Sequence, residues 1–246
     1  MRKQEHHNGS GRERDAVHCT RPLGSSTVRV PNSALGRPRL ILASASPRRR
    51  RLLRQAGYRF EVKPPRPKGP SDGAGTIEDD AIRDAPTAAA YVESLAYLKA
   101  MAAIETHRLT GGLVLGADTA VELGGQIIGK PRDEDDARRI LALLSGSVHR
   151  VLTGLALVEP ATGRRLLAHA ATTVRMRRMS DEEIDAYGGG GEALGKAGAY
   201  ALQETGDRYV ESIEGSFTNV VGLPMATLEQ MLKAAGYDPR NFRTTD

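Results

Sequence analysis

The stretch from Leu40 to Leu53 limits the possible folds of this chain most strongly, because it joins an apolar run, a serine-rich turn and a helix in direct succession. Leu40-Ile41-Leu42-Ala43 predicts a short buried strand. Ser46 is a favourable N-cap, and Pro47 suits the first position of a helix. The segment therefore predicts a strand, a serine-rich turn and a helix, in that order.

The predicted helix has an unusual charge at its start. Its first turn holds the arginines 48–51, although the partial positive charge of a helix N-terminus favours acidic side chains. A bound anion would relieve this repulsion, and free N–H groups, the Ser44 and Ser46 hydroxyls and a guanidinium together suit phosphate. A solvated basic face is the alternative interpretation, and this stretch alone does not decide between the two.

Five further motifs follow in order along the chain: Gly116-Ala117-Asp118-Thr119, Gly129-Lys130-Pro131, Leu144-Ser145-Gly146, Lys196-Ala197-Gly198-Ala199-Tyr200-Ala201-Leu202-Gln203 and Val221-Gly222-Leu223-Pro224. With the Ser-x-Ser-Pro-Arg sequence before them, they resemble the Maf family of nucleoside triphosphate pyrophosphatases, from about Leu40 to about Tyr237. The resemblance implies a single α/β domain with an extended mixed sheet in two lobes flanking a nucleotide cleft. It also implies a possible homodimer.

The chain divides into three parts. Residues 1–38 carry seven Arg or Lys and three Asp or Glu, without apolar periodicity, and predict a disordered basic extension. Residues 39–237 predict the Maf-like domain, and residues 238–246 a short C-terminal tail. We expect a cytoplasmic protein, because the only cysteine, Cys19, lies in the extension and the remaining chain can form no disulfide. We expect no membrane span and no specific nucleic-acid partner, because no apolar run approaches ~18 residues and the charge outside the extension is nearly balanced.

Several secondary-structure elements have clear signals. Residues 87–107 and 133–144 predict helices, and Ser180-Asp181-Glu182-Glu183 is a capping box that opens another. Strands are expected over 113–121, 149–158 and 166–176, with a hairpin turn at Gly124-Gly125. Further candidates are a strand over 58–62, a long loop over 63–86 and a closing helix over 224–235.

The family resemblance implies which side chains hold the triphosphate of a nucleotide substrate. Ser44, Ser46 and Arg48 can bind phosphate oxygens, and Lys99, Lys130 and Lys196 can neutralise the remaining charge. Each lysine also has a simpler interpretation. Lys99 could extend over the core with its amine in water, and the other two could be surface residues.

Asp118 is the candidate catalytic residue, because it matches the position regarded in the family as the proton acceptor. A carboxylate inside an apolar strand is costly unless it is paired or bound to a metal. Asp118, with Glu78 or Asp79 from the long loop, offers the oxygen ligands preferred by Mg²⁺ or Mn²⁺. Because aspartate is a weak base at neutral pH, we expect Asp118 to act largely by holding the metal and orienting water. For His149 we expect a structural role.

Three positions bear on the nucleobase. Within the family, a subgroup acting on dTTP and UTP has an arginine, a threonine and a glutamine where this chain has Arg48, Thr119 and Gln203. The Gln203 amide can pair with the O4 acceptor and N3–H donor of uracil or thymine. Alternatives are a preference for methylated guanine nucleotides and a nucleotide-binding regulator of septum formation. A nucleic-acid binder would rest on the extension alone.

Overall fold

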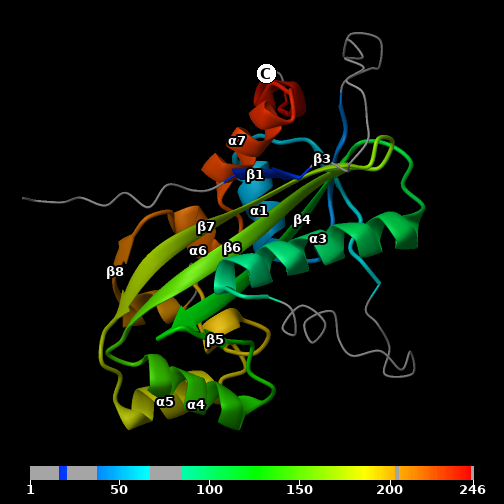
Figure 1. Ribbon diagram of the computed structural model, residues 1–246. Coiled ribbons are helices and arrows are strands. Elements are labelled where there is room, and N and C mark those ends of the chain that lie inside the picture. Colours follow the sequence, from blue (N-terminus) through cyan, green and yellow to red (C-terminus); the bar gives the residue numbers. More distant parts are fainter. Residues whose placement is uncertain (1–16, 21–37, 67–84, 203–204, 245–246) are drawn as a thin grey trace, which may run out of the picture.

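The computed structural model describes residues 17–20, 38–66, 85–202 and 205–244. Within these ranges eight strands form one curved sheet with helices on both faces (Figure 1). The strands are β1 (Val17–Thr20), β2 (Leu40–Leu42), β3 (Phe60–Val62), β4 (Leu113–Leu123), β5 (Gln126–Ile128), β6 (Val148–Glu159), β7 (Arg164–Met176) and β8 (Val210–Glu214). The α-helices are α1 (Pro47–Gln55), α3 (Ala88–His107), α4 (Glu134–Leu144), α5 (Asp181–Gly188), α6 (Phe217–Val221) and α7 (Met225–Ala234).

The sheet is mixed and unusually long in the strand direction. Its order is β1-β7-β6-β4-β2-β3, with β5 paired to β4 and β8 to β7. β2 is parallel to both β3 and β4, whereas the other pairings are antiparallel. β4, β6 and β7 contain 11, 12 and 13 residues, which corresponds to about 35–45 Å at the usual rise per residue. Strands of this length can carry helices at two separate places.

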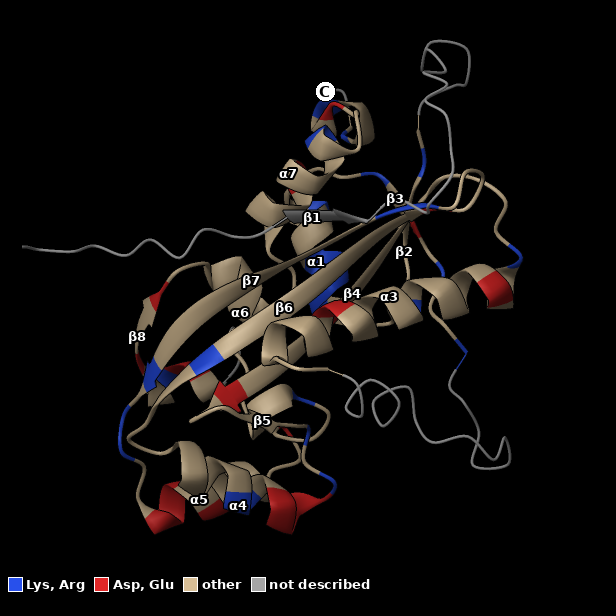
Figure 2. Ribbon diagram, viewed as in Figure 1, with Lys and Arg blue, Asp and Glu red and all other residues tan. Residues whose placement is uncertain are grey.

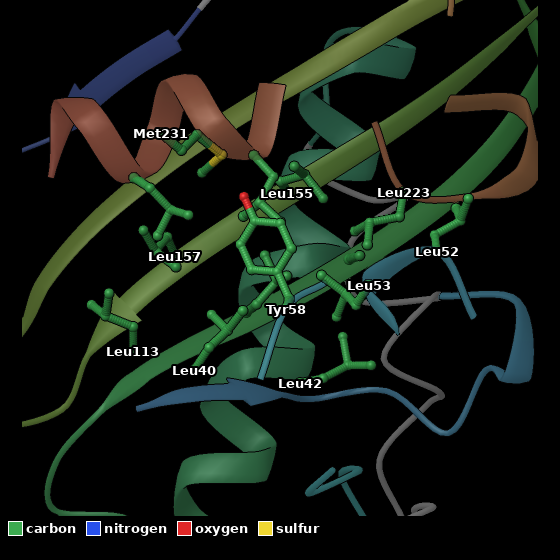
Figure 3. Close-up of a cluster of buried hydrophobic side chains, with 14 of the residues drawn as sticks. Leu40, Leu42, Leu52, Leu53, Tyr58, Leu113, Leu155, Leu157, Leu223 and Met231 are labelled. Atoms are coloured by element: carbon green, nitrogen blue, oxygen red, sulfur yellow. The ribbon is translucent and has the colours of Figure 1, made fainter. Parts of the chain in front are cut away.

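The first lobe forms where α1 and α7 cover one face of the sheet. Leu53 of α1 and Met231 of α7 pack with Leu40, Leu115 and Leu157 of the strands. Figure 3 shows Tyr58 in the middle of these side chains. Each leucine buried in this way contributes roughly 1.5–3 kcal/mol. The apolar run Leu40-Ile41-Leu42 is therefore an interior strand of the sheet, between β3 and β4, and contributes to this core.

The second lobe lies at the other end of the long strands. Val121, Val151 and Val174 of β4, β6 and β7 pack there against Ile140 of α4 and Ile184 of α5. The predicted mixed sheet in two lobes is thus confirmed, because one set of strands serves two hydrophobic cores. No helix in the described part of the chain is both long and apolar enough to cross a lipid bilayer.

Most of the predicted elements are confirmed, including the caps that start them. Ser46, Thr87, Asp133 and Ser180 are the N-caps of α1, α3, α4 and α5, and the capping box at Ser180 is formed. The Gly124-Gly125 turn joins β4 to β5. The short elements β8 and α6 were not expected, since neither segment is long enough to show a clear periodicity.

The N-terminal 38 residues differ in part from the predicted disordered extension. Val17–Thr20 forms β1, which pairs antiparallel with Thr20 opposite Arg165 and Val17 opposite Ala168 on β7. The backbone of an edge strand presents unpaired N–H and C=O groups, and these can order a segment that has no apolar pattern of its own. Residues 1–16 and 21–37 of this extension lie outside the described ranges.

The described residues of the predicted C-terminal tail at 238–246 pack against the first lobe. Pro239–Phe242 forms the 3-10 helix η3, and Phe242 is 1% exposed within the first core. Backbone hydrogen bonds join Arg59 N–H to the Phe242 carbonyl (2.7 Å) and Thr244 N–H to the Gly57 carbonyl (2.9 Å). One large buried aromatic side chain is enough to anchor this short segment. The segment is too short to show hydrophobic periodicity, so its sequence does not predict the packing.

Phe242→Ala should therefore lower the free energy of unfolding by about 3–5 kcal/mol, as expected for truncating a fully buried phenylalanine. The neighbouring Asn241 has an exposed side chain, so Asn241→Ala is the matched control and should stay within about 0.5 kcal/mol of the wild type. Urea unfolding followed by circular dichroism measures both variants. Equal stability of the two variants would mean that the segment is a tail after all.

Candidate functional site

The turn between β2 and α1 presents two serine hydroxyls at a helix N-terminus. The Ser46 Oγ caps α1 by accepting from the Arg49 backbone N–H (3.5 Å). The Ser44 Oγ accepts from the Ser46 N–H at 3.2 Å and from Arg49 Nη1 at 3.1 Å. Figure 2 contrasts the basic α1 with the acidic first turns of α4 and α5. Hydroxyl groups and positive charge at a helix N-terminus are chemically suited to an anion.

Arg49 connects this turn to two other parts of the fold. Its Nε donates to the Gly222 carbonyl (2.8 Å) and its Nη2 to the Thr119 Oγ1 (3.2 Å), in addition to the bond from Nη1 to Ser44. Burial lowers the pKa of this guanidinium, the nearby Asp118 opposes that effect, and Arg48 adds to it. Guanidinium groups remain protonated in proteins, so Arg49 brings a partly desolvated positive charge to the site.

Gly222 makes this arrangement possible. Its φ of +117° ends α6 in the left-handed region, which glycine adopts without strain. A Cβ at this position would lie 3.4 Å from the Thr119 Oγ1 and 3.8 Å from the Arg49 Nε. A glycine therefore lets the carbonyl approach the guanidinium while its backbone lies against Thr119.

Asp118 and Lys99 form an ion pair across the interface of β4 and α3. The Lys99 Nζ lies 2.5 Å from the Asp118 Oδ1, and the two side chains are 16% and 8% exposed. Two glycines on the sheet let α3 come this close. A Cβ at Gly116 would lie 2.0 Å from the Ala96 carbonyl oxygen, and one at Gly154 would lie 2.3 Å from the Val92 backbone. The catalytic candidate is thus held by the lysine that the sequence had already singled out.

A cavity opens beside these groups. It measures about 40 Å³, and its polar lining includes Arg48, Thr119 and Lys196; Ala201 and Leu202 form part of its apolar wall. Sites that enclose a drug-sized ligand usually measure about 300–1,000 Å³. In this conformation the cavity has room for only a small part of a nucleotide.

Lys196 reaches the cavity from a tightly held loop. The Gly198 N–H donates to the Gly129 carbonyl (3.2 Å), and Gly198 has a φ of +71° in η1 (Ala197–Ala199). Behind this loop, the Tyr200 hydroxyl lies 2.8 Å from the His149 Nε2. Burial lowers the pKa of His149 to about 4. A neutral, buried imidazole bonded to a tyrosine has the contacts of a structural residue.

Not all the predicted residues meet at the cavity. Of the predicted residues, Arg48, Thr119 and Lys196 line it. Ser44 and Ser46 lie at the start of α1, where Arg49 joins Ser44 to Thr119. The Lys99–Asp118 pair lies between α3 and β4, close enough for Asp118 to act on the pKa of Arg49. Lys130 is exposed and does not line the cavity, although its neighbour Gly129 contacts the Lys196 loop. Glu78, Asp79 and Gln203 lie outside the described residues.

The residues present fit a divalent cation in part. Among the described residues, no three His, Cys, Asp or Glu side chains lie close enough to hold a metal. Magnesium sites that use a nucleotide need only one or two carboxylates, since the phosphates supply further ligands. Asp118 can be one of these carboxylates, because Lys99 donates to its Oδ1 and the second oxygen, Oδ2, can coordinate a cation.

The sequence did not identify Arg49, Thr153 and Asn219 as parts of the site. Arg49 stands in a run of four arginines, and only the helical phase of α1 distinguishes it from its neighbours. Thr153 and Asn219 are fully buried polar residues, and each has an apolar residue beside it in the sequence. A polar residue in an apolar run is a signal that can be sought in a sequence, but its partners come from distant segments.

The fold and this site define an α/β protein with a cationic, serine-lined turn and a buried lysine–aspartate pair. The family profile described as Maf-like protein matches residues 39–235. The dTTP/UTP pyrophosphatase of Anaeromyxobacter dehalogenans is 47% identical over 202 residues, which cover 81% of this chain and 95% of that protein. The enzyme of the same name from Moorella thermoacetica is 44% identical over 200 residues, covering 81% and 96%.

The chain belongs to the Maf family. Among solved structures, a nucleoside-triphosphatase (dITP/XTP pyrophosphatase) from Mycobacterium abscessus covers 80% of this chain and 95% of its own, with 14% identity and a TM-score of 0.35. That likeness is too weak to support any further conclusion.

The close approach of α3 to the sheet leads to a prediction. Gly116→Ala should lower the free energy of unfolding by about 1–3 kcal/mol or more, because the new methyl group meets the helix backbone, which cannot rotate away. Gly111→Ala is the control, since a Cβ there meets nothing within 4 Å. Thermal unfolding of both variants provides the measurement. A Gly116→Ala protein as stable as the control would contradict the packing described.

Proposed function

We propose that this protein is a nucleoside triphosphate pyrophosphatase that hydrolyses dTTP and UTP to the nucleoside monophosphate and pyrophosphate. The observation that carries the proposal is the nearness of the Lys99–Asp118 pair to a cationic, serine-lined helix N-terminus, where the Asp118 carboxylate acts on the pKa of Arg49. Relatives named dTTP/UTP pyrophosphatase are 41–47% identical over about four fifths of the chain, which supports both the activity and the substrate class.

The triphosphate would lie against the start of α1. The Ser44 and Ser46 hydroxyls can donate to phosphate oxygens, while Arg48, Arg49 and Lys196 neutralise charge. Neutralisation matters because phosphoryl transfer is catalysed largely by positioning and by electrostatic stabilisation of the phosphate oxygens. The two donors on Nη1 and Nη2 of Arg49 that its protein partners do not use can serve the same oxygens.

The reaction itself requires a water molecule placed in line with the leaving pyrophosphate. A water oxygen forms a bond to the α-phosphorus, the bond from that phosphorus to the bridging oxygen breaks, and pyrophosphate leaves. Asp118 would orient this water and take its proton, and Lys99 fixes the carboxylate for that task. A Mg²⁺ or Mn²⁺ ion held by Asp118, with Glu78 or Asp79, would supply further positive charge at the phosphates.

The base preference rests on three residues. Arg48 and Thr119 line one cavity together with Ala201 and Leu202, the two residues directly before Gln203. The shared cavity supports the proposed role of Arg48 and Thr119 in recognising uracil or thymine. Sites that hydrogen-bond a base discriminate strongly against an analogue that leaves those bonds unmade.

A panel of nucleotides with detection of pyrophosphate tests the function directly. We expect dTTP and UTP to give the highest kcat/KM, with a nucleoside monophosphate as the second product and loss of turnover in a chelator that Mg²⁺ or Mn²⁺ restores. Release of inorganic phosphate with a nucleoside diphosphate would contradict the pyrophosphatase assignment. Better hydrolysis of 7-methyl-GTP than of dTTP would overturn only the base preference.

Asp118→Asn should reduce kcat by about a hundredfold or more, the scale expected for a central catalytic group. The control is Asp136→Asn on α4, since Asp136 is also a buried carboxylate, paired with Arg139 at 2.8 Å, but belongs to a helix that packs in the second lobe. That hydrogen bond lowers the pKa of Asp136. The control should therefore lose stability and keep its turnover. Loss of turnover in Asp136→Asn with normal turnover in Asp118→Asn would show that Asp118 is not the catalytic residue.

A further inference from the structure

A line of hydrogen bonds runs from the site into the core through four residues. The Arg49 Nη2 donates to the Thr119 Oγ1 (3.2 Å), which lies 2.9 Å from the Thr153 Oγ1. The Thr153 Oγ1 donates to the backbone carbonyl of Asn219 (3.0 Å). Thr119 reaches the cavity, whereas Thr153 and Asn219 are fully buried and do not line it.

The direction of each bond in this line is fixed by counting protons. A hydroxyl has one proton to donate, and a backbone carbonyl can only accept. Thr153 therefore donates its proton to the Asn219 carbonyl, so Thr119 must donate its own proton to Thr153. With that proton committed, the Thr119 oxygen accepts from Arg49 and can only accept from a ligand as well.

The carbonyl at the end of the line is itself held in place. The Asn219 side-chain amide donates to the Val151 carbonyl and to the Thr172 Oγ1, both at 2.9 Å. The Ser216 Oγ caps α6 by accepting from the Asn219 N–H at 3.2 Å. Since these partners belong to β6, β7 and the start of α6, the acceptor for Thr153 does not depend on the ligand.

We propose that Thr153 is a positioning residue that makes Thr119 a pure hydrogen-bond acceptor, and that this polarity lets the pocket distinguish thymine and uracil from cytosine. Uracil and thymine carry an N3–H donor, which can bond to the Thr119 oxygen. Cytosine carries an unprotonated N3, which would face that oxygen as a second acceptor. The proposal rests on the proposed dTTP/UTP activity and assigns part of its selectivity to a residue outside the cavity.

The test compares the kcat/KM values for dTTP and dCTP in variants of Thr153. Thr153→Val keeps the shape and removes the acceptor, which frees the Thr119 proton to bond to cytosine. The ratio of dTTP to dCTP should fall about tenfold, the effect of roughly one hydrogen bond. Thr153→Ser restores the hydroxyl and should restore the ratio. Thr227→Val on α7, a buried threonine away from the cavity, is the control for loss of a buried hydroxyl.

An unchanged ratio in Thr153→Val, with turnover of both nucleotides reduced equally, would show a merely structural role and overturn the proposal. If the valine variant fails to fold, Thr153→Ala provides the same comparison. The affinities for dTMP and dCMP, measured by calorimetry, must show the same shift without any turnover. A wild type that prefers dTMP but hydrolyses no triphosphate would contradict the proposed function while leaving this inference standing.

Discussion

The three hydrogen bonds of the Arg49 guanidinium are the constraint on which the site depends. They join the turn after β2, the middle of β4 and the carbonyl that follows α6, segments that lie far apart in the chain. A planar fork with donors in fixed directions can hold three such acceptors at once, which a lysine cannot do. The same group keeps a positive charge beside the helix N-terminus, so one residue both assembles the turn and prepares it for phosphate.

The site also requires α3 to lie close to the sheet, and glycines on the strands, which have no side chains, make this possible. Gly116 on the sheet faces Ala96 and Ala100 of the helix, and Gly154 faces the helix backbone at Val92, so the two backbones come into contact. Lys99 then reaches Asp118 inside the interface, where the pair is shielded from water. Ion pairs are stronger where water is excluded, and the site gains a carboxylate with a fixed orientation.

Much of this architecture could be predicted from local patterns. The caps at Ser46, Thr87, Asp133 and Ser180 and the Gly124-Gly125 turn act within a few residues, so they are visible in the sequence. The bonds from Arg49 to the neighbouring segments depend on Thr119 and Gly222, which lie 70 and 173 residues away in the chain. β1, the contacts of Phe242 and the line of bonds through Thr153 likewise arise from tertiary pairing and have no local signature.

The most direct test of this account is the rate of dTTP hydrolysis by Arg49→Lys. Lysine keeps the charge but cannot hold Ser44, Thr119 and the Gly222 carbonyl together, so kcat/KM should fall at least about tenfold, equivalent to about 1.4 kcal/mol. Arg51→Lys, on the same helix with an exposed side chain, should behave as the wild type. Wild-type kcat/KM in Arg49→Lys would show that charge alone suffices and that the guanidinium does not assemble the site.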